Sequence, residues 1–490
     1  MEGLHMNRFT RRKFLRTLAL SGTTAWAASR LGFLTNSGLA ASPITSKGGV
    51  LDLPLTARMG VLSLAGRRAT LYSYNGSVPG PRLEIRSGDH FRIRFTNRLP
   101  ELTNLHLHGL HVSPSGNADN VFLEIPPGES QTYEFSIPPD HRGGTYWYHP
   151  HVHHLIARQV WAGLVGLLIV RGELDDIPEI RDADEEFLVL KDFGLDENGD
   201  LLTPDPTPRI MQGREGDLIL VNGGLNPTFR IPKDSLLRLR FLNASVARYY
   251  RLQLEDHPMY LIATDGGPIA EPFEIRELLL APGERAEALV RGERSSGQYR
   301  LMNLPYRRFN MGMMGRRGMM GRTPISSDEP TVLATFQYQE SGRALPLPTR
   351  LVPVEPLPEA IEDRQLVFGH NMMGMQGMEF TINGMTFDPE RTDTIVKVGT
   401  VEEWEIVNGG GMMMMDFDHP FHIHTNAFQV VSENGRKPRF SAWRDVVNVP
   451  MGESVRIRIP FQDFPGRTVY HCHILDHEDL GMMAVIEMRA

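Results

Sequence analysis

The sequence is poor in cysteine, in long apolar runs and in concentrated positive charge. Cys472 is the single cysteine, so no disulfide bond can form within the chain. The apolar stretch from Leu15 to about Ala28 is too short and too polar for a membrane span, and no other segment approaches that length. The net charge is −8 and the signs alternate along the chain, which argues against a nucleic-acid-binding protein.

Glycine, proline, methionine and histidine are the residues that stand out. A chain of 490 residues predicts two to four domains. Its 47 glycines and 35 prolines favour many short strands and turns, since helical periodicity is scarce outside short stretches such as residues 175–182. The 24 methionines and 18 histidines are clustered, and these clusters carry most of the functional prediction.

Residues 1–41 have the form of an export signal. The pair Arg11 and Arg12 precedes the apolar stretch, and small residues around Ala40 offer a cleavage site. This order of features is typical of a cleavable twin-arginine signal peptide, and the alternative is an amphipathic helix that stays attached. We therefore expect the twin-arginine export machinery as a partner. The folded protein is then expected in the periplasm or outside the cell.

One layout occurs three times in the chain. Each copy has an Asn-Gly pair, at Asn75, Asn222 and Asn383, followed by an alternating strand that ends in asparagine. A Gly-Glu pair then precedes a second alternating strand, at residues 128–129, 283–284 and 452–453. Asn-Gly favours a tight turn between strands. The period of about 150 to 160 residues is that of a whole domain.

The strands themselves show a period of two. Phe91, Ile93 and Phe95 share one face, and the polar residues between them share the other. This pattern predicts an all-β fold of three consecutive antiparallel β-sandwich domains, at residues 45–172, 173–347 and 348–490. The Pro-rich stretch 345–358 has the composition of a linker between the last two.

Ten of the 18 histidines fall into four clusters. On a strand, His-x-His places both imidazoles on one face, close enough to bind one metal ion or to flank a pair. A single such pair is typical of a protein surface, whereas four clusters favour a metal centre built from neutral imidazoles. The four clusters are His106 and His108; His149 and His151; His419, His422 and His424; and His471, His473 and His477.

Cys472 narrows the choice of metal. A cysteine, a histidine five residues later (His477) and a methionine ten residues later (Met482) supply three ligands of a blue-copper site, with a second histidine from elsewhere. A zinc site would need more cysteines or a carboxylate. His471 and His473 should point to the face opposite the thiolate, so the metal they bind is linked to the blue copper through a few backbone bonds. Such a link is an electron path.

The four histidine motifs, in this order in a chain of three repeats, resemble the multicopper oxidases, and in detail the bacterial three-domain laccases and cuprous oxidases. The resemblance covers essentially the whole chain after the export signal. It implies three cupredoxin-like domains and four copper ions, one in a mononuclear blue site and three in a trinuclear cluster. It also implies that electrons removed singly from a reductant reduce dioxygen to two waters.

The resemblance assigns a ligand role to each clustered residue. The mononuclear copper is expected at His419, Cys472 and His477, with Met482 as the axial ligand. One copper of the trinuclear cluster is expected at His106 and His422, and the paired coppers at two sets of three histidines. The second repeat carries no ligand and is expected to act as a spacer. The two sets are His108, His149 and His473, and His151, His424 and His471.

Oxygen reduction consumes protons, so acidic groups are expected near the cluster. The resemblance indicates Asp119 and Glu478, with Glu124 as the fallback for Asp119, and the alternative for each is an ordinary surface acid. Three further histidines lie off the matched spacing and are expected beside the ligands or at the surface. They are His111, His153 and His154.

Three methionine-rich runs suggest what is oxidised. One spans residues 311–320, one residues 372–378 and one residues 412–415, and glycine and arginine interrupt the first. Thioether sulfur is a soft ligand that selects Cu(I). The hypothesis is that these loops lie near the mononuclear copper and capture cuprous ions; the alternative is a flexible lid. The substrate candidates are Met311, Met313, Met314, Met319 and Met320.

The leading interpretation is a copper-dependent oxidase that acts on cuprous ion and on phenols or aromatic amines, with dioxygen as acceptor. A copper nitrite reductase would need neither histidines on both sides of Cys472 nor paired motifs in the first repeat. An exported copper buffer or a non-catalytic scaffold with the same fold is the alternative outside enzymes. We expect a monomer without nucleic-acid partners and without stable membrane insertion.

Overall fold

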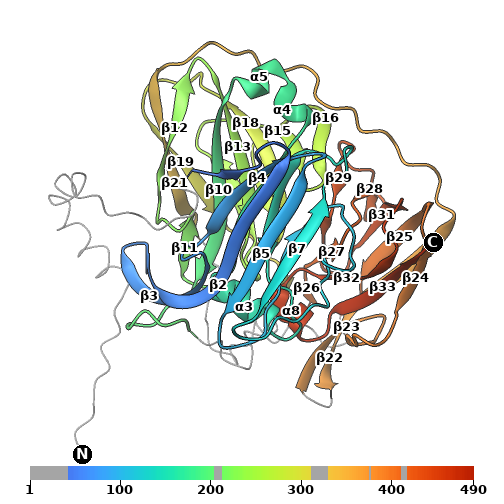
Figure 1. Cartoon of the computed structure of the whole chain (residues 1–490). Helices are drawn as coiled ribbons and strands as arrows, with labels where there is room; N and C mark the ends of the chain where they lie inside the picture. Colours follow the sequence, from blue (N-terminus) through green and yellow to red (C-terminus); the bar gives the residue numbers. More distant parts are fainter. Residues whose placement is uncertain (1–41, 203–211, 311–328, 375–376, 410–415) are drawn as a thin grey trace, which may run out of the picture. The chain divides into compact units, whose positions relative to one another are not determined.

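The protein is described by a computed structural model that covers residues 42–202, 212–310, 329–374, 377–409 and 416–490. The predicted signal peptide lies outside these residues. Strands dominate and form the sheets of three β-sandwiches, which follow one another from blue to red in Figure 1. Among the described residues, no helix combines the length and the apolar character that crossing a membrane requires.

The first sandwich packs a five-stranded sheet, in the order β1-β4-β9-β8-β6, against a four-stranded sheet, in the order β3-β2-β5-β7. Their facing sides form one core that includes Leu55, Phe91 and Leu107. The strands are β1 (Ile44–Thr45), β2 (Val50–Leu64), β3 (Arg67–Tyr74), β4 (Gly80–Arg86), β5 (His90–Arg98), β6 (His106–His108), β7 (Ser130–Ser136), β8 (Gly144–His149) and β9 (Gly166–Arg171).

The second sandwich packs a six-stranded sheet, in the order β11-β10-β13-β18-β15-β16, against a five-stranded sheet, in the order β12-β21-β19-β14-β17. Phe241 and Leu252 belong to its core. The strands are β10 (Asp184–Phe193), β11 (Leu218–Val221), β12 (Thr228–Lys233), β13 (Leu236–Asn243), β14 (Tyr250–Leu254), β15 (Met259–Thr264), β16 (Gly267–Ile275), β17 (Leu278–Leu280), β18 (Arg285–Arg291), β19 (Gln298–Leu304) and β21 (Thr331–Ser341).

The third sandwich packs a six-stranded sheet, in the order β23-β22-β25-β31-β28-β29, against a five-stranded sheet, in the order β24-β33-β32-β27-β30. Trp404 and Phe421 lie in its core. The strands are β22 (Glu362–Gly374), β23 (Gly377–Ile382), β24 (Thr394–Lys397), β25 (Thr400–Asn408), β27 (His419–Ile423), β28 (Phe428–Glu433), β29 (Trp443–Arg444), β30 (Val446–Val449), β31 (Ser454–Phe461), β32 (Gly466–Cys472) and β33 (Met483–Arg489).

The all-β prediction of three sandwiches is confirmed, but the sheets are mixed rather than purely antiparallel. In each sandwich the long first strand of one sheet runs parallel to a later strand: β2 to β5, β10 to β13 and β22 to β25. Alternation of apolar and polar residues predicts which face of a strand is buried. It does not predict whether the neighbouring strand runs parallel or antiparallel. The domain boundaries drawn from composition stay predictions; the sandwich strands fall within 44–171, 184–341 and 362–489.

The threefold repeat appears as the same turn in each sandwich. Asn75, Asn222 and Asn383 all have φ between 52° and 55°, and each following glycine also has positive φ. Two successive residues in this region make a type I′ turn, which asparagine followed by glycine accommodates best. In all three turns the asparagine Oδ1 accepts a backbone N–H from the adjacent strand, at 2.7 to 2.8 Å.

The asparagine that ends the next strand is equally repeated. The backbone N–H groups of Asn97, Asn243 and Asn408 donate to the carbonyl oxygens of Glu129, Glu284 and Glu453, the glutamates of the three Gly-Glu pairs. Each of the three asparagine side chains is buried and donates to main-chain carbonyl groups. The repeated sequence signals therefore mark equivalent positions in three copies of one fold.

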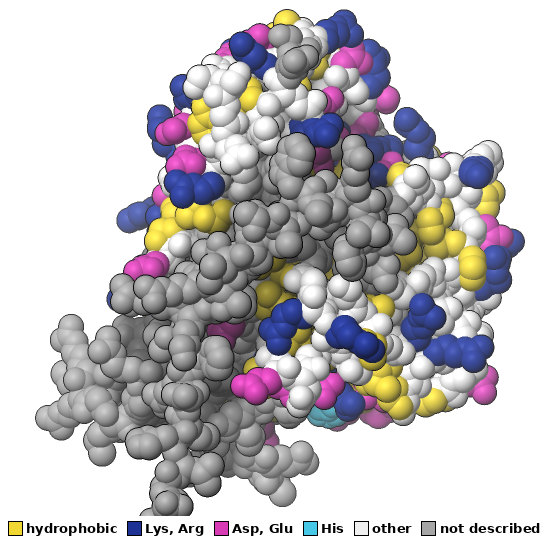
Figure 2. All heavy atoms as spheres, turned by 90° about the vertical axis from the view of Figure 1, so that its left-hand side faces the viewer, with side chains coloured by type: hydrophobic (Ala, Val, Ile, Leu, Met, Phe, Trp, Pro, Cys, Tyr) yellow, Lys and Arg dark blue, Asp and Glu magenta, His cyan; other side chains and the backbone are white. Residues whose placement is uncertain are grey.

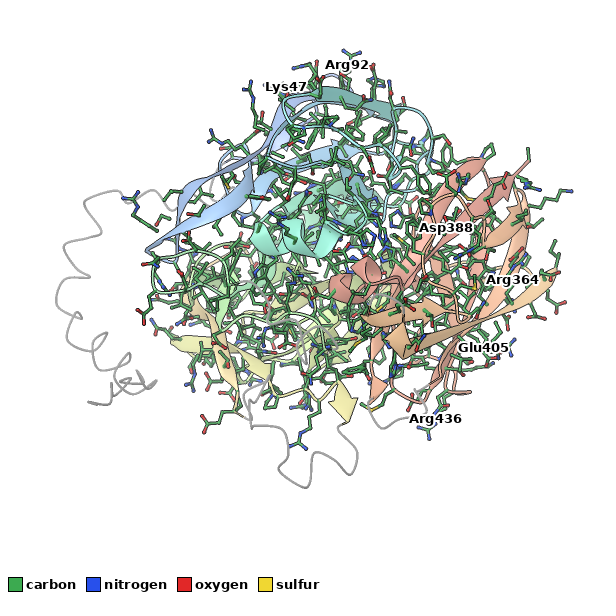
Figure 3. The ribbon with its side chains drawn as sticks, turned by 90° about the horizontal axis from the view of Figure 1, so that it is seen from below. Lys47, Arg92, Arg364, Asp388, Glu405 and Arg436 are labelled. Atoms are coloured by element: carbon green, nitrogen blue, oxygen red, sulfur yellow. The ribbon has the colours of Figure 1, made fainter. Side chains whose placement is uncertain are left out.

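In the part of the chain that the structure describes, the short helices between the strands are α3 (Ile156–Ala162), α4 (Glu173–Asp176), α5 (Pro178–Arg181) and α8 (Leu475–Asp479). Helix α3 of the first sandwich packs against α8 of the third, and Figure 3 shows the two side by side. Lys47 and Arg436, two exposed charged residues labelled in that view, lie at its outer edge.

The described surface carries both signs of charge. Figure 2 shows lysine and arginine side chains interspersed with aspartate and glutamate over the face it presents. No continuous basic stripe is visible among the described residues of that face, in agreement with the net charge of −8.

Candidate metal centre

The paired histidines lie on two pairs of neighbouring strands or within two residues of their ends. In the first sandwich β6 and β8 are antiparallel, and His106 is opposite His149. In the third sandwich β27 and β32 are antiparallel, and His422 is opposite His471. The residues between the histidines, Leu107, Ile423 and Cys472, belong to the sandwich cores. Period-two alternation thus sends the histidines to the other face of each sheet.

These two histidine faces meet across the interface between the first and third sandwiches. The rings of His106 and His424 stack with centroids 4.0 Å apart, and those of His108 and His422 with centroids 3.9 Å apart. The Nε2 atom of His471 lies 3.1 Å from that of His424 and 3.4 Å from that of His151. Histidines from distant ends of the sequence therefore form one buried cluster.

Several histidine nitrogens are unprotonated or without a hydrogen-bond partner, as binding to a metal ion requires. The Nε2 atoms of His106 and His422, Nδ1 of His424 and both ring nitrogens of His473 are buried without a hydrogen-bond partner. Burial, together with the neighbouring histidines, holds the pKa of His106 and His424 well below the ordinary value, so the rings are neutral. Unpaired buried nitrogens are costly unless something binds them. Neutral imidazole lone pairs aimed at one space fit transition-metal ions such as copper.

The nitrogens fall into groups that could each hold an ion. His151, His424 and His471 form one group whose ligand atoms lie within 4.8 Å of one another, and this is one of the two predicted triples. His106 and His422 are grouped with His424. Of the other predicted triple, His108 and His149 group with His106, while the His473 ring lies 5.0 Å from that of His108 and 5.9 Å from that of His149.

A second, sulfur-containing site lies behind the strand that carries His471 and His473. The Sγ atom of Cys472 is 3.3 Å from Nδ1 of His419 and 3.8 Å from Nδ1 of His477, and the two nitrogens are 3.3 Å apart. All three side chains are buried. Burial raises the pKa of the Cys472 thiol, so a bound metal cation is needed to hold the thiolate.

Met482 lies in the same core cluster as Cys472 and is fully buried. The backbone holds it there, because the Cys472 N–H donates to the Met482 carbonyl and the Met482 N–H donates to that of His477. Two imidazoles, one thiol and a nearby thioether are the donor set of a blue-copper site.

Models of the multicopper oxidase family match residues 56–175, 186–341 and 362–490, one to each sandwich. The chain belongs to the multicopper oxidases. Family membership implies copper as the metal, with dioxygen and a reductant as the reacting partners.

Three known proteins illustrate the similarity. The multicopper oxidase mco of Staphylococcus haemolyticus is 31% identical over 428 residues, covering 85% of this chain and 83% of its own. The cell division protein FtsP of Photorhabdus laumondii is 29% identical over 489 residues, covering 96% and 97%. The solved multicopper oxidase of Campylobacter jejuni, described as a metallo-oxidase, superposes with a TM-score of 0.80 at 32% identity, covering 92% of this chain and 93% of its own.

Helix α8, which carries the predicted ligand His477, is held by contacts with the other two sandwiches. The Asp479 carboxylate accepts the backbone N–H groups of Ile156 and Ala157 at the start of α3. Asp476 accepts the Arg214 guanidinium at 2.6 and 2.8 Å. These contacts tie α8, and with it His477 and Glu478, to both other sandwiches.

The two predicted acids of the multicopper oxidase site lie against the histidine cluster. Both Asp119 carboxylate oxygens are 3.0 Å from Nδ1 of His106, and burial raises the pKa of Asp119 to about 7. The Glu478 oxygens lie 3.1 Å from Nε2 of His151 and 3.1 Å from Nδ1 of His471, without hydrogen-bond alignment, and burial raises the pKa of Glu478. The fallback residue Glu124 is exposed.

The histidines outside the matched spacing stay outside the metal groups. His111 contacts Asp463 through Nε2 and the Thr425 carbonyl through Nδ1, each at 2.6 Å. The rings of His153 and His154 lie 3.7 Å apart, beside Phe387. None of the three belongs to a metal-binding group among the described residues.

Sequence reasoning missed two buried residues beside the cluster, Asp445 and Arg285. Asp445 Oδ1 lies 3.1 Å from Nε2 of His108, and both Asp445 oxygens accept the Arg285 guanidinium. Burial raises the pKa of Asp445 to about 6. Neither residue belongs to a histidine motif, so no spacing signal distinguishes them from surface charges.

The substrate candidates Met311, Met313, Met314, Met319 and Met320 lie outside the described residues. Their nearest described neighbours in the sequence form the strand β20 (Phe309–Asn310), which pairs with β26 (Asp416–Phe417) in a two-stranded sheet. Asn310 is opposite Asp416. Because β26 ends two residues before His419, this two-stranded sheet adjoins in the sequence a residue of the sulfur-containing site.

Proposed function

We propose that this multicopper oxidase couples the one-electron oxidation of cuprous ion, and of phenols or aromatic amines, to the four-electron reduction of dioxygen to two waters. The observation that carries the proposal is the segment His471–Cys472–His473 at the end of β32. It presents its thiol to His419 and His477 on one face and its two imidazoles to the first-sandwich histidines on the other.

Four copper ions are proposed to bind these donor atoms, and when bound they would supply the one-electron redox chemistry that links the reductant to dioxygen. His419, Cys472 and His477, with Met482 nearby, would hold the mononuclear copper. His106 and His422 would hold one copper of the trinuclear cluster. The remaining two would be held by His108, His149 and His473, and by His151, His424 and His471.

The chain's own contribution to electron transfer is a short covalent path. Cys472 is bonded through the backbone to His471 and His473, so the two sites are joined within three consecutive residues. The Ile474 N–H donates to Cys472 Sγ at 3.4 Å, and a hydrogen bond to the thiolate favours its charged form. The buried core around Cys472 excludes water from this path.

Asp119 and Glu478 are proposed to supply the protons that oxygen reduction consumes. Each carboxyl is buried within 3.1 Å of ring nitrogens of the cluster, and burial raises the pKa of each. A carboxyl whose pKa is raised can carry a proton near neutral pH and release it to a nearby acceptor. Asp119 also orients His106, whose Nδ1 faces the carboxylate.

Cuprous ion is the reductant that the methionine runs favour. Asn310 and Asp416, which are paired, adjoin the runs 311–320 and 412–415 in the sequence. The run 372–378 contains Met378, which packs on the core of the third sandwich. It precedes Phe380, whose ring stacks on that of His477 with centroids 3.9 Å apart. All three runs thus adjoin described residues next to the mononuclear site, and thioether sulfur selects Cu(I).

The substrate proposal is tested by replacing the methionines of residues 311–320 with leucine, which keeps size and apolar character and removes sulfur. We expect oxygen uptake with cuprous ion to fall at least tenfold while uptake with a phenol is kept. Leucine in place of Met59, an exposed methionine on β2, is the matched control. Unchanged turnover of cuprous ion would contradict the proposal.

A non-catalytic role is the second candidate, because the chain also resembles a protein named for cell division over almost its whole length. A scaffold is under no chemical requirement to keep copper ligands, yet every predicted ligand is present and buried here. Copper content and oxygen uptake separate the two: four coppers with turnover support the oxidase, and a copper-loaded chain without uptake supports a copper-binding protein.

Export by the twin-arginine route completes the proposal. The signal at residues 1–41 is read by a machinery that carries folded proteins, which suits a chain whose cluster is assembled from two sandwiches. Replacing both Arg11 and Arg12 with lysine should leave the protein inside the cytoplasm, as measured by fractionation of the producing cells. Export that is unaffected by the replacement would contradict the route.

A further inference from the structure

Asp445, between β29 and β30 of the third sandwich, contacts histidines of two domains. Its Oδ1 lies 3.1 Å from Nε2 of His108 in the first sandwich and 3.5 Å from Nδ1 of His422. Its main-chain carbonyl accepts Nδ1–H of His422 at 2.8 Å. Asp445 is 1% exposed, so these contacts are made away from water.

These contacts decide which nitrogen each histidine offers to a metal. His108 donates Nε2–H to Asp445, which leaves the Nδ1 lone pair facing His149, whose Nε2 is 3.4 Å away. His422 donates Nδ1–H to the carbonyl, which leaves its unpartnered Nε2 free to bind. The acid and its own carbonyl therefore set opposite tautomers in two neighbouring rings.

Asp445 is in turn held by Arg285 at the start of β18, in the second sandwich. The Arg285 Nη1 and Nη2 atoms donate to the two Asp445 oxygens at 2.7 and 2.5 Å. The three remaining N–H groups donate to the carbonyl oxygens of Thr145, Gly283 and Asp265. All five donors of this buried guanidinium are used, and a planar fork of this kind fixes a carboxylate in one orientation.

The backbone around the pair has no room for further side chains. Gly109 has φ of +87°, and a Cβ atom there would collide with Nη2 of Arg285 and Oδ2 of Asp445. Gly283 has φ of +83°, and a Cβ atom there would lie 2.9 Å from the His473 ring. Glycine at both positions lets the backbone close tightly on the pair and on the cluster.

We propose that the second domain is a working part of the trinuclear site, in which Arg285 and Asp445 are positioning residues. They hold the rings of His108 and His422, from the other two domains, in the tautomer and orientation that binds copper. The inference rests on the proposed copper function and goes beyond the spacer role expected for this domain. Outer contacts of this kind raise metal affinity by about 10- to 100-fold.

The test compares Arg285→Met and Arg285→Lys with a control, Arg238→Met, in the full-length protein loaded with copper. Arg238 is also a buried arginine of the second sandwich, bound to Asp175 and Glu287 at 2.7 and 2.6 Å, and it contacts no ligand histidine. Each protein is measured for copper per chain under chelator competition, intensity of the blue band and the electron paramagnetic resonance spectrum of the non-blue copper.

We expect Arg285→Met to keep the blue band while the non-blue copper changes its spectrum and is retained about 10- to 100-fold less tightly. Arg285→Lys keeps the positive charge but not the planar, two-pronged guanidinium. Its affinity for the non-blue copper should lie between that of Arg285→Met and that of the unmodified protein. Arg238→Met should lower the melting temperature and keep its full copper complement. Asp445→Asn, which keeps the shape of the side chain, should shift the same spectrum as Arg285→Met.

If the non-blue copper of Arg285→Met keeps the spectrum and the affinity of the unmodified protein, the positioning role is wrong. It is also wrong if blue and non-blue copper are lost in parallel in Arg285→Met and Arg238→Met, since that result describes a general loss of folding. If the unmodified protein binds no copper and shows no blue band, the proposed function itself fails, and the inference falls with it.

Discussion

The Sγ atom of Cys472 lies 3.3 Å from Nδ1 of His419, across the neighbouring strands β32 and β27. On the opposite face of β32, His471 and His473 join histidines of the first sandwich. One strand thus forms the boundary between a sulfur-containing site and a cluster of imidazoles. This relationship is the basis of the predictions that follow.

Cys472→Ser should remove the blue band and lower the copper content by one ion per chain. Serine oxygen is a poor substitute for a thiolate at a copper site, whereas the imidazole cluster lies on the other face of the strand and loses no ligand. Oxygen uptake should fall to the background rate, because the path from the reductant is cut. Copper analysis with visible spectroscopy checks the result; a remaining blue band would place that site elsewhere.

Glu478→Gln should slow oxygen reduction while reduction of the blue copper stays normal. The amide keeps the shape of the side chain but cannot deliver a proton, and loss of a positioned acid typically costs about 10²- to 10⁴-fold. The rate at which the blue band bleaches without oxygen should equal that of the unmodified protein. The steady-state rate of oxygen uptake should be lower. Asp476→Asn on the same helix, which loses its contact with Arg214, is the control and should show no such split. Equal slowing of both steps by Glu478→Gln would argue for a structural role.

Asp119→Asn should weaken copper at the site of His106 and His422. The carboxylate faces Nδ1 of His106 with both oxygens, and an amide offers one oxygen where two are used. We expect affinity for that copper to fall about 10- to 100-fold, as measured by chelator competition. Glu124→Gln changes an exposed acid of the same segment and should have no effect. The prediction fails if Asp119→Asn and Glu124→Gln bind this copper with the same affinity.

Lys191→Met should stabilise the protein most at and below neutral pH. Burial lowers the pKa of Lys191 to about 7 in the folded state, and its Nζ has no hydrogen-bond partner. Between pH 7 and its ordinary pKa the unfolded chain binds this proton and the folded chain does not, so stability of the unmodified protein rises with pH in that window. The difference between the ordinary lysine pKa of 10.5 and a pKa of about 7 corresponds to roughly 5 kcal/mol.

The gain in unfolding free energy from Lys191→Met should therefore be greatest near pH 6 to 7 and should shrink toward pH 10. Denaturant titrations of both proteins across this range measure the difference directly. Lys47→Met, at an exposed lysine, is the control and should give a difference that is independent of pH. A constant gain for Lys191→Met would show that the buried amine is not the cause.

Much of the site was predictable because successive residues of a strand point to opposite faces of its sheet. His-x-His at 106–108 and 422–424, and His-Cys-His at 471–473, follow the period of two, so the sequence alone indicates that imidazoles and thiol lie on opposite faces. The Asn-Gly turns were also predictable, since Asn75, Asn222 and Asn383 readily adopt the left-handed backbone that such a turn requires and that the structure shows.

Other features left no trace in the sequence. Parallel pairing of β2 with β5 depends on which strands become neighbours, and alternation carries no information about that. Asp445 is separated by 337 residues from His108, and Arg285 comes from another domain, so neither has a spacing relation to the motif it supports. A buried acid or arginine looks like a surface charge until its partners are known.

Oxygen uptake driven by a cuprous salt, with the products counted, tests the central claim most directly. The copper-loaded protein is predicted to consume one dioxygen for every four cuprous ions oxidised, to release no hydrogen peroxide, and to stop doing so when Cys472 is replaced by serine. A fully loaded protein that consumes no oxygen, or that consumes one dioxygen for every two cuprous ions and releases peroxide, would contradict the account.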